Sequence, residues 1–114
     1  MTDNNRRRLS VPGFHILLAL ADGDRHGYGI MTEVEHRSEG RFRLWPATLY
    51  GAIKRMVAEG LIEPGPAPEG EDARRNYYRL TDLGKETLGA ETRRMDDLVQ
   101  LARSKNVLSW TRSR

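Results

Sequence analysis

The feature that most constrains this chain is a long helical segment near its C-terminal end. Helix propensity is high over residues 86–105, and apolar side chains recur there at Leu88, Met95, Val99 and Ala102, with spacings of 7, 4 and 3 residues. A helix of about 20 residues spans about 30 Å. That length exceeds what a chain of 114 residues can cover with its own domain. We therefore expect this row of apolar side chains, the seam, to be buried against another chain.

The composition agrees with a chain that needs a partner. Hydrophobic residues make up 38% of the sequence and charged residues 31%, so the core is thin and further burial through a partner would add stability. Leu98 and Leu101 widen the seam. The predicted interface between two copies of the chain consists of Leu88, Met95, Leu98, Val99 and Ala102.

Three shorter helices are predicted before this segment. The first begins after Ser10, a good N-cap, and ends at the Asp-Gly-Asp sequence of residues 22–24. The second begins near His26 and ends before Gly40. The third begins at Pro46, which suits the first position of a helix, and ends at Gly60.

Apolar spacing predicts the buried face of each of these helices. In the first helix the face is Val11, Phe14, Leu17, Leu18 and Ala21. In the second it is Tyr28, Met31 and Val34, with Ile30 as a further candidate, and Gly29 is expected to allow close packing against the first or third helix. In the third it is Leu49, Ile53, Met56 and Val57.

Two short strands are predicted between the third helix and the long one. Residues 61–63 and 77–80 are apolar or aromatic and flank a loop rich in Pro, Gly and charge, the pattern of a β-hairpin. Three helices followed by a hairpin form a winged helix-turn-helix. The predicted fold is thus mainly α with a small β-hairpin, in four parts: a disordered basic arm (1–9), a winged helix-turn-helix DNA-binding domain (10–80), a C-terminal dimerisation helix (81–105) and a tail (106–114).

The free face of the third helix has the chemistry of a DNA reader. Thr48, Tyr50, Lys54 and Arg55 point away from the predicted core, and a single helix fits the major groove. Thr48 can contact a phosphate or a thymine methyl, and the two cations can bind phosphates or guanine. The alternative is an ordinary solvated face with Tyr50 half-buried.

The wing offers a second, mixed set of charges. Arg74 and Arg75 are placed to hold a phosphate near the second strand. Acidic side chains precede them at Glu69, Glu71 and Asp72. The alternative for the two arginines is therefore pairing with these acids, which is worth little on a surface.

Other functional classes fit poorly. The chain has no cysteine, so thiolate zinc sites and cysteine nucleophiles are excluded. His15, His26 and His36 lack metal-ligand spacing, and we expect no enzyme activity, cofactor or metal. The N-terminus lacks the apolar region of a signal peptide and no segment is long enough to span a membrane, which predicts a cytoplasmic protein. A net charge of +3 permits nucleic acid as a partner without demanding it.

Four segments resemble the PadR family of transcriptional regulators, in its order and at its usual spacing. They are His26-Gly27-Tyr28-Gly29-Ile30, the run Pro46-Ala47-Thr48-Leu49-Tyr50-Gly51-Ala52-Ile53-Lys54-Arg55-Met56, Glu59-Gly60-Leu61-Ile62, and Arg75-Asn76-Tyr77-Tyr78-Arg79-Leu80-Thr81-Asp82-Leu83-Gly84. The single C-terminal helix resembles the family's short subgroup. The resemblance implies a homodimeric repressor that binds a pseudo-palindromic duplex DNA operator. It also places the DNA contacts on Thr48, Tyr50, Lys54 and Arg55, with support from Arg74 or Arg75.

The resemblance further implies that a small apolar or aromatic effector relieves repression. Met95 stands where some relatives carry an aromatic residue that stacks on a drug. Phe14, Met95, Leu98 and Val99 could line an apolar cleft, or they could form dimer core alone. Trp45 also departs from the family, which often has a small or capping residue there, and we expect this side chain to pack beneath the third helix.

Two other functions remain open at this stage. A winged helix can serve as a protein-interaction module, and an apolar free face on the third helix would favour that function. The acidic wing tip would suit a ligand sensor that has lost strong DNA binding.

Overall fold

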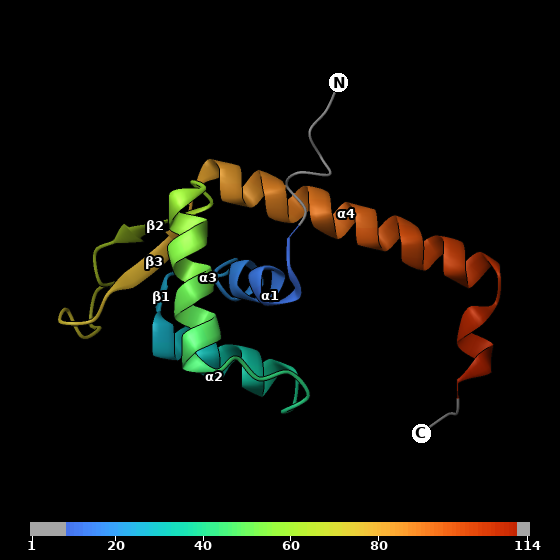
Figure 1. Cartoon of the computed structure of the whole chain (residues 1–114), viewed down its shortest axis with the longest axis horizontal. Coiled ribbons are helices and arrows are strands. Elements are labelled where there is room, and N and C mark those ends of the chain that lie inside the picture. The colour runs from blue at the N-terminus through green and yellow to red at the C-terminus, as the bar shows by residue number, and fades with distance from the viewer. Residues whose placement is uncertain (1–8, 112–114) are drawn as a thin grey trace.

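The computed structural model describes residues 9–111, so the predicted arm at Arg6–Arg8 lies outside the described residues. The predicted helices and strands occur in the predicted order, with a short strand and a short 3₁₀ helix in addition (Figure 1). The helices are α1 (Val11–Ala19), α2 (Gly27–Arg37), α3 (Pro46–Ala58), α4 (Asp82–Ser104) and a short 3₁₀ helix, η2 (Val107–Trp110). The strands are β1 (Arg25–His26), β2 (Ile62–Gly65) and β3 (Tyr77–Leu80). This is the predicted winged helix-turn-helix with one long C-terminal helix.

Polar side chains cap three of the four α-helices. The backbone N–H of Gly13 donates to Ser10 Oγ (3.1 Å) at the start of α1, and that of Gly84 donates to Thr81 Oγ1 (2.9 Å) at the start of α4. His26 Nδ1 accepts from the N–H of Gly29 (2.9 Å) at the start of α2. Each cap satisfies a backbone donor that has no partner within its helix, so each fixes where the helix begins.

The sheet has three strands, one more than predicted. Its order is β1-β3-β2 and both pairings are antiparallel, with Arg25 opposite Tyr78 and Ile62 opposite Leu80. The additional strand, β1, has two residues and lies in the turn between α1 and α2. Its pairing with β3 attaches the base of the wing to the helix-turn-helix.

A single core joins the helices to the sheet. The fully buried large side chains come from α1, α2, α3 and β2, and they are Ile16, Leu17, Ile30, Leu49 and Ile62. The start of α4 closes this core, with Leu88 only 8% exposed. Gly84 has no room for a side chain, because a Cβ there would overlap the carbonyl oxygen of Leu61.

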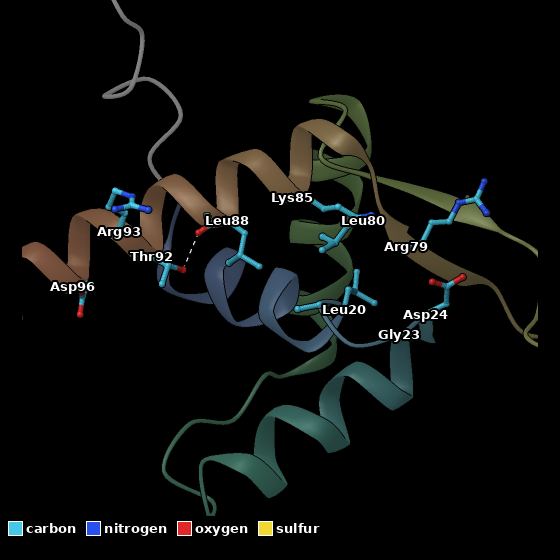
Figure 2. Close-up of a pocket in the computed structure, with 12 residues that line it drawn as sticks. Leu20, Gly23, Asp24, Arg79, Leu80, Lys85, Leu88, Thr92, Arg93 and Asp96 are labelled. Carbon is cyan, nitrogen blue, oxygen red and sulfur yellow. Dashed lines mark hydrogen bonds between the residues drawn. The ribbon is translucent and has the colours of Figure 1, made fainter.

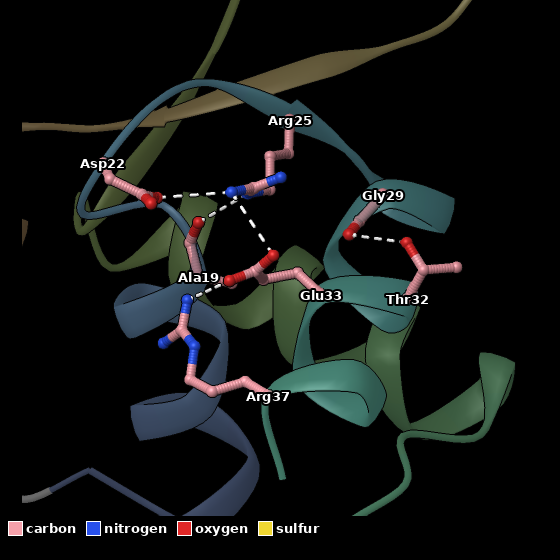
Figure 3. Close-up of polar contacts among 7 residues, drawn as sticks. All are labelled: Ala19, Asp22, Arg25, Gly29, Thr32, Glu33 and Arg37. Atoms are coloured by element: carbon pink, nitrogen blue, oxygen red, sulfur yellow. Dashed lines mark hydrogen bonds and ion pairs between the residues drawn. The ribbon is translucent and has the colours of Figure 1, made fainter. Parts of the chain in front are cut away.

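An arginine in the α1–α2 turn ties the first two helices together (Figure 3). Arg25 Nε donates to the carbonyl oxygen of Ala19 (2.8 Å), and Nη2 lies 3.3 Å from Asp22 Oδ1 and 3.5 Å from Glu33 Oε1. Glu33 also pairs with Arg37 one turn further along α2. The end of α1, the turn and α2 are therefore linked through one half-buried guanidinium.

Two predicted burial patterns are shifted. Tyr28 is 56% exposed, because α2 begins at Gly27 and directs Gly27, Ile30 and Val34 inward. Val57 is 36% exposed, and Ala52 takes its place in the buried face of α3. Two α1 positions are exposed as well: Val11 by 60%, and Ala21, which lies beyond the helix end.

Candidate nucleic-acid interface

The free face of α3 carries all four side chains predicted to contact DNA. Thr48, Tyr50, Lys54 and Arg55 are exposed, whereas Leu49, Ala52, Ile53 and Met56 are buried on the opposite side. Gly51 has no side chain, so this face is flat at that position. A Cβ built there would stand 3.8 Å from Arg55 Nη1, which is an ordinary contact distance. The face is thus polar and basic, not apolar.

Tyr50 links α3 to the start of α2. The side chain is 51% exposed, and its ring lies against Gly27, where a Cβ would stand 2.5 Å from the hydroxyl oxygen and 2.8 Å from Cε1. The close-approach glycine of α2 is therefore Gly27. At Gly29, which was expected to fill that role, a Cβ would stand 3.4 Å from the ring of the capping residue His26.

The two wing arginines share one carboxylate. Arg74 Nε lies 3.1 Å from Asp72 Oδ1, and Arg75 Nε lies 3.8 Å from Asp72 Oδ2. Hydrogen bonds from Arg74, with a smaller contribution from the charge of Arg75, lower the pKa of the Asp72 carboxyl. Because the Arg74 side chain is 91% exposed, this pairing is weak and a phosphate can replace the carboxylate.

A small polar cavity joins the wing arginines to Tyr50. It has a volume of about 180 Å³ and is lined by His26, Gly27, Tyr28, Tyr50, Arg74, Arg75, Asn76 and Tyr78. The guanidinium carbon of Arg75 lies 5.9 Å from the ring centroid of Tyr28. Three of the predicted DNA contacts thus border one depression. Sequence reasoning missed Tyr28 here because it assigned that side chain to the core.

The N-terminal end of α3 presents a tryptophan to solvent. Trp45 is 63% exposed, which corrects the prediction that it packs beneath the helix. Leu44 occupies the buried position instead, with 4% exposure. Trp45 stands at the N-cap position, and the guanidinium carbon of Arg43 lies 5.9 Å from its ring centroid.

The predicted dimer seam divides into a buried and an exposed part. Leu88 belongs to the core of its own chain, and Met95 and Ala102 are half-buried. Leu98 and Val99 are 53% and 45% exposed, and Leu101 beside them is 53% exposed. The ribbon of α4 extends beyond the other helices (Figure 1), and its second half carries these exposed apolar side chains.

A larger cleft lies between α4, β3 and the end of α1 (Figure 2). Its volume is about 760 Å³. The apolar floor consists of Leu20, Leu80 and Leu88. The charged residues that line it are Asp24, Arg79, Lys85, Arg93 and Asp96. In the described part of the chain, the residues predicted for an effector cleft (Phe14, Met95, Leu98 and Val99) do not line this one. Phe14 packs against the core as a partly buried side chain.

Two of the histidines, His15 and His26, take part in packing and helix capping. His15 stacks on Phe42 with 4.1 Å between ring centroids, and burial, with a smaller effect of the Arg37 charge, lowers its pKa. His26 is half-buried as the α2 cap and meets the Tyr77 ring edge-on. Among residues 9–111, no three metal-binding side chains cluster, and no helix is both long and apolar enough to cross a bilayer.

Comparison with family models gives one match, to the Transcriptional regulator PadR-like family, over residues 16–90. An uncharacterised protein X of Lysinibacillus sphaericus is 36% identical over 70 residues, which are 61% of this chain and 64% of that protein. A 37.1 kDa protein of a Streptomyces fradiae transposon is 40% identical over 80 residues, 70% of this chain but only 21% of its own length. Transcriptional regulator Rv3488 of Mycobacterium tuberculosis is 31% identical over 86 residues, 75% of this chain and 77% of that protein.

Solved structures show the same fold. A PadR family transcription regulator from Clostridium difficile superposes with a TM-score of 0.69 at 28% identity, over 83% of this chain and 97% of that one. Bacillus subtilis PadR in complex with operator DNA superposes with a TM-score of 0.61 at 26% identity, over 71% of this chain and 46% of that one.

Proposed function

Because the chain belongs to the PadR-like family of transcriptional regulators, we propose that it is a homodimeric repressor of a pseudo-palindromic operator. Family members are regulators and not enzymes, in agreement with the sequence prediction. The protein would act in the cytoplasm, on duplex DNA. Each subunit would place α3 in the major groove of one half-site.

The observation that carries the proposal is the free face of α3. Thr48, Lys54 and Arg55 are exposed together on one side of a helix whose other side is buried. Lys and Arg there can neutralise phosphates or donate to guanine, and the flat surface at Gly51 lets the helix backbone approach the bases. The complex of Bacillus subtilis PadR with operator DNA supports the same use of this fold.

Two of the wing residues would hold the adjacent backbone. Arg74 and Arg75 can exchange the Asp72 carboxylate for a DNA phosphate, because both anions accept the same guanidinium hydrogen bonds. Tyr50 at the neighbouring cavity would add a hydroxyl donor to the same phosphate. This arrangement fixes the orientation of α3 but carries no sequence information.

The exposed apolar face of α4 supports the dimer. Leu98 and Val99 lie beyond the body and would pack on the same residues of a second copy, with Met95 and Ala102 at the edge of the contact. Leu88 has its partners within its own chain, so the proposed interface begins further along the helix. A two-fold pairing of this kind presents two copies of α3 to a pseudo-palindrome.

An effector is the remaining part of the proposal. A small apolar or aromatic molecule would bind where Phe14, Met95, Leu98 and Val99 of the two subunits meet, and would shift the two α3 helices relative to each other. Titration with anilinonaphthalene sulfonate, an aromatic probe, tests this part. Its fluorescence should rise on the dimer, and the probe should weaken operator binding in proportion to its occupancy.

The direct test is a fluorescence anisotropy titration of the purified protein on the DNA upstream of its own gene. It is made at two salt concentrations and in the presence of non-specific competitor DNA. We expect tight, competitor-resistant binding with two chains per duplex. If non-specific competitor DNA abolishes binding, the result would favour one of the two alternatives: a protein-interaction module, or a ligand sensor that has lost strong DNA binding.

Variants of α3 sharpen the test. Lys54→Ala and Arg55→Ala should each weaken operator binding by about 1–3 kcal/mol, and loss of a phosphate contact should also flatten the salt dependence. Lys105→Ala removes an exposed cation beyond the end of α4 and serves as the matched control. Wild-type binding by both α3 variants would show that this helix does not read DNA.

A further inference from the structure

We propose that Trp45 reads sequence: its indole ring contacts the 5-methyl group of a thymine in the operator. This inference rests on the proposed DNA binding and adds a base preference to it.

The Trp45 side chain is not part of the hydrophobic core. The residue is 63% exposed at the N-cap position of α3, and within residues 9–111 its side chain makes no capping hydrogen bond. Its neighbour Leu44 supplies the buried contact, at 4% exposure. An indole left in water exposes a large apolar surface, and covering that surface on binding is favourable.

The backbone around Trp45 is fixed before any DNA arrives. On one side, the N–H of Phe42 donates to Ser38 Oγ (3.0 Å) and the Phe42 ring stacks on His15. On the other side, the carbonyl oxygen of Trp45 accepts from the N–H of Leu49 (2.9 Å) in the first turn of α3. Little conformational entropy is lost when a ring on such a backbone meets a ligand.

The surroundings of the ring point toward DNA. The Arg43 guanidinium carbon lies 5.9 Å from the ring centroid, and Glu35 holds that guanidinium through Nη2 (3.1 Å). Thr48, the nearest predicted DNA contact, is exposed one turn further along the helix. In helix-turn-helix proteins, the N-terminal residues of the recognition helix are those that contact base edges.

The chemistry of the major groove selects the base. Its base edges present hydrogen-bond donors and acceptors, and the thymine methyl is the one apolar group among them. Indole offers a single N–H donor and an otherwise apolar surface. A thymine methyl is therefore the base feature that an exposed tryptophan at this end of α3 is suited to cover.

The test removes that methyl group and nothing else. Wild-type protein first selects its preferred duplex from a random library, and each thymine is then replaced in turn by deoxyuridine. Dissociation constants are measured by anisotropy for the wild type, Trp45→Ala and Trp45→Phe. At one thymine of each half-site we expect deoxyuridine to weaken wild-type binding about fourfold, the effect of burying one methyl group.

The variants decide whether Trp45 is the contact. Trp45→Ala should bind the thymine duplex more weakly than the wild type and should not respond to deoxyuridine at that position, whereas Trp45→Phe should keep part of the response. Trp110→Ala, which changes a tryptophan that is 77% exposed on η2, should behave as the wild type. Circular dichroism melts establish that each variant is folded.

Two failures are distinguishable. If Trp45→Ala responds to every deoxyuridine as the wild type does, Trp45 does not read thymine, even though the protein binds DNA. A uniform loss with unchanged methyl sensitivity would indicate a phosphate contact and would also overturn the inference. If the wild type selects no duplex, the proposed function itself fails.

Discussion

The two halves of α4 lie along one continuous helical face and have opposite surroundings. In the first half, Thr87, Leu88 and Glu91 are buried against the body. In the second half, Leu98 and Val99 are about half exposed, at 53% and 45%. The period of a sequence therefore defines which face of a helix is apolar, but the length of the domain decides how much of that face its own chain can cover.

The largest expected effect comes from placing charge on the exposed half. The double variant Leu98→Asp/Val99→Asp should fold as a monomer, because these side chains lie outside the core of the chain. Operator affinity should fall by about 100-fold or more, since the second half-site no longer binds as part of the same complex. Sedimentation equilibrium and anisotropy titration measure the two losses.

The control for this variant is Gln100→Asp, which adds one of the two negative charges at an exposed polar position of α4. It should remain dimeric. If the double variant sediments as an undisturbed dimer, the interface lies elsewhere on the chain and the two halves of α4 differ in exposure alone.

A smaller effect is expected from crowding the buried half. Gly84→Ala would force a methyl group into the carbonyl oxygen of Leu61, and rigid backbone cannot move aside as a flexible side chain would. We expect a loss of about 1–3 kcal/mol in the free energy of unfolding, the usual range for overpacking, measured by urea denaturation. The oligomeric state of the folded fraction should not change.

Gly89→Ala is the control within the same helix. A Cβ there would meet no other atom within 4 Å among the described residues. Alanine should therefore stabilise the helix by about 0.5–1 kcal/mol relative to glycine. Equal effects of the two substitutions would mean that the first half of α4 does not pack on the wing base as described.

The smallest effect concerns pH. Burial lowers the pKa of His15, so the unfolded chain takes up a proton at a higher pH than the folded chain does. The stability of the body should fall as the pH drops through the ordinary value of histidine, about 6.5, and the fall should continue to the folded pKa. The long helix α4 contains no histidine.

Thermal melts of wild type and His15→Gln between pH 7.5 and pH 5 test this prediction. The wild type should lose more stability than the variant on acidification, while the dimer dissociation constants of both stay level. An equal acid response in the two proteins would show that His15 keeps an ordinary affinity for protons.

Sequence reasoning succeeded where local chemistry decides the structure. Ser10 was predicted as an N-cap and Pro46 as a helix start, because these residues act on backbone groups within one turn. The exposed side of α3 followed from the 3.6-residue period. The grouping of Lys54 with Arg55 on that side needed no tertiary information.

Sequence reasoning failed where a tertiary contact decides. Strand β1 has two residues, too few for any period, and exists because β3 offers it a hydrogen-bonding edge. Tyr28 and Trp45 are large and aromatic, so burial was the natural expectation for both. In the structure Ile30 and Leu44 occupy the inward positions, and the two aromatic rings remain at the surface near α3.

The pairing of β1 with β3 also holds the wing at a fixed distance from the helix-turn-helix within one chain. The strand joins the wing to the α1–α2 turn, and Tyr50 against Gly27 joins that region to α3. The parts of one subunit that would touch DNA therefore move as a unit. In the proposed dimer, the adjustable distance would be that between the two α3 helices, about 34 Å for half-sites one helical turn apart. A few degrees of rotation where two α4 helices cross would be magnified along their length into a mismatch with that spacing.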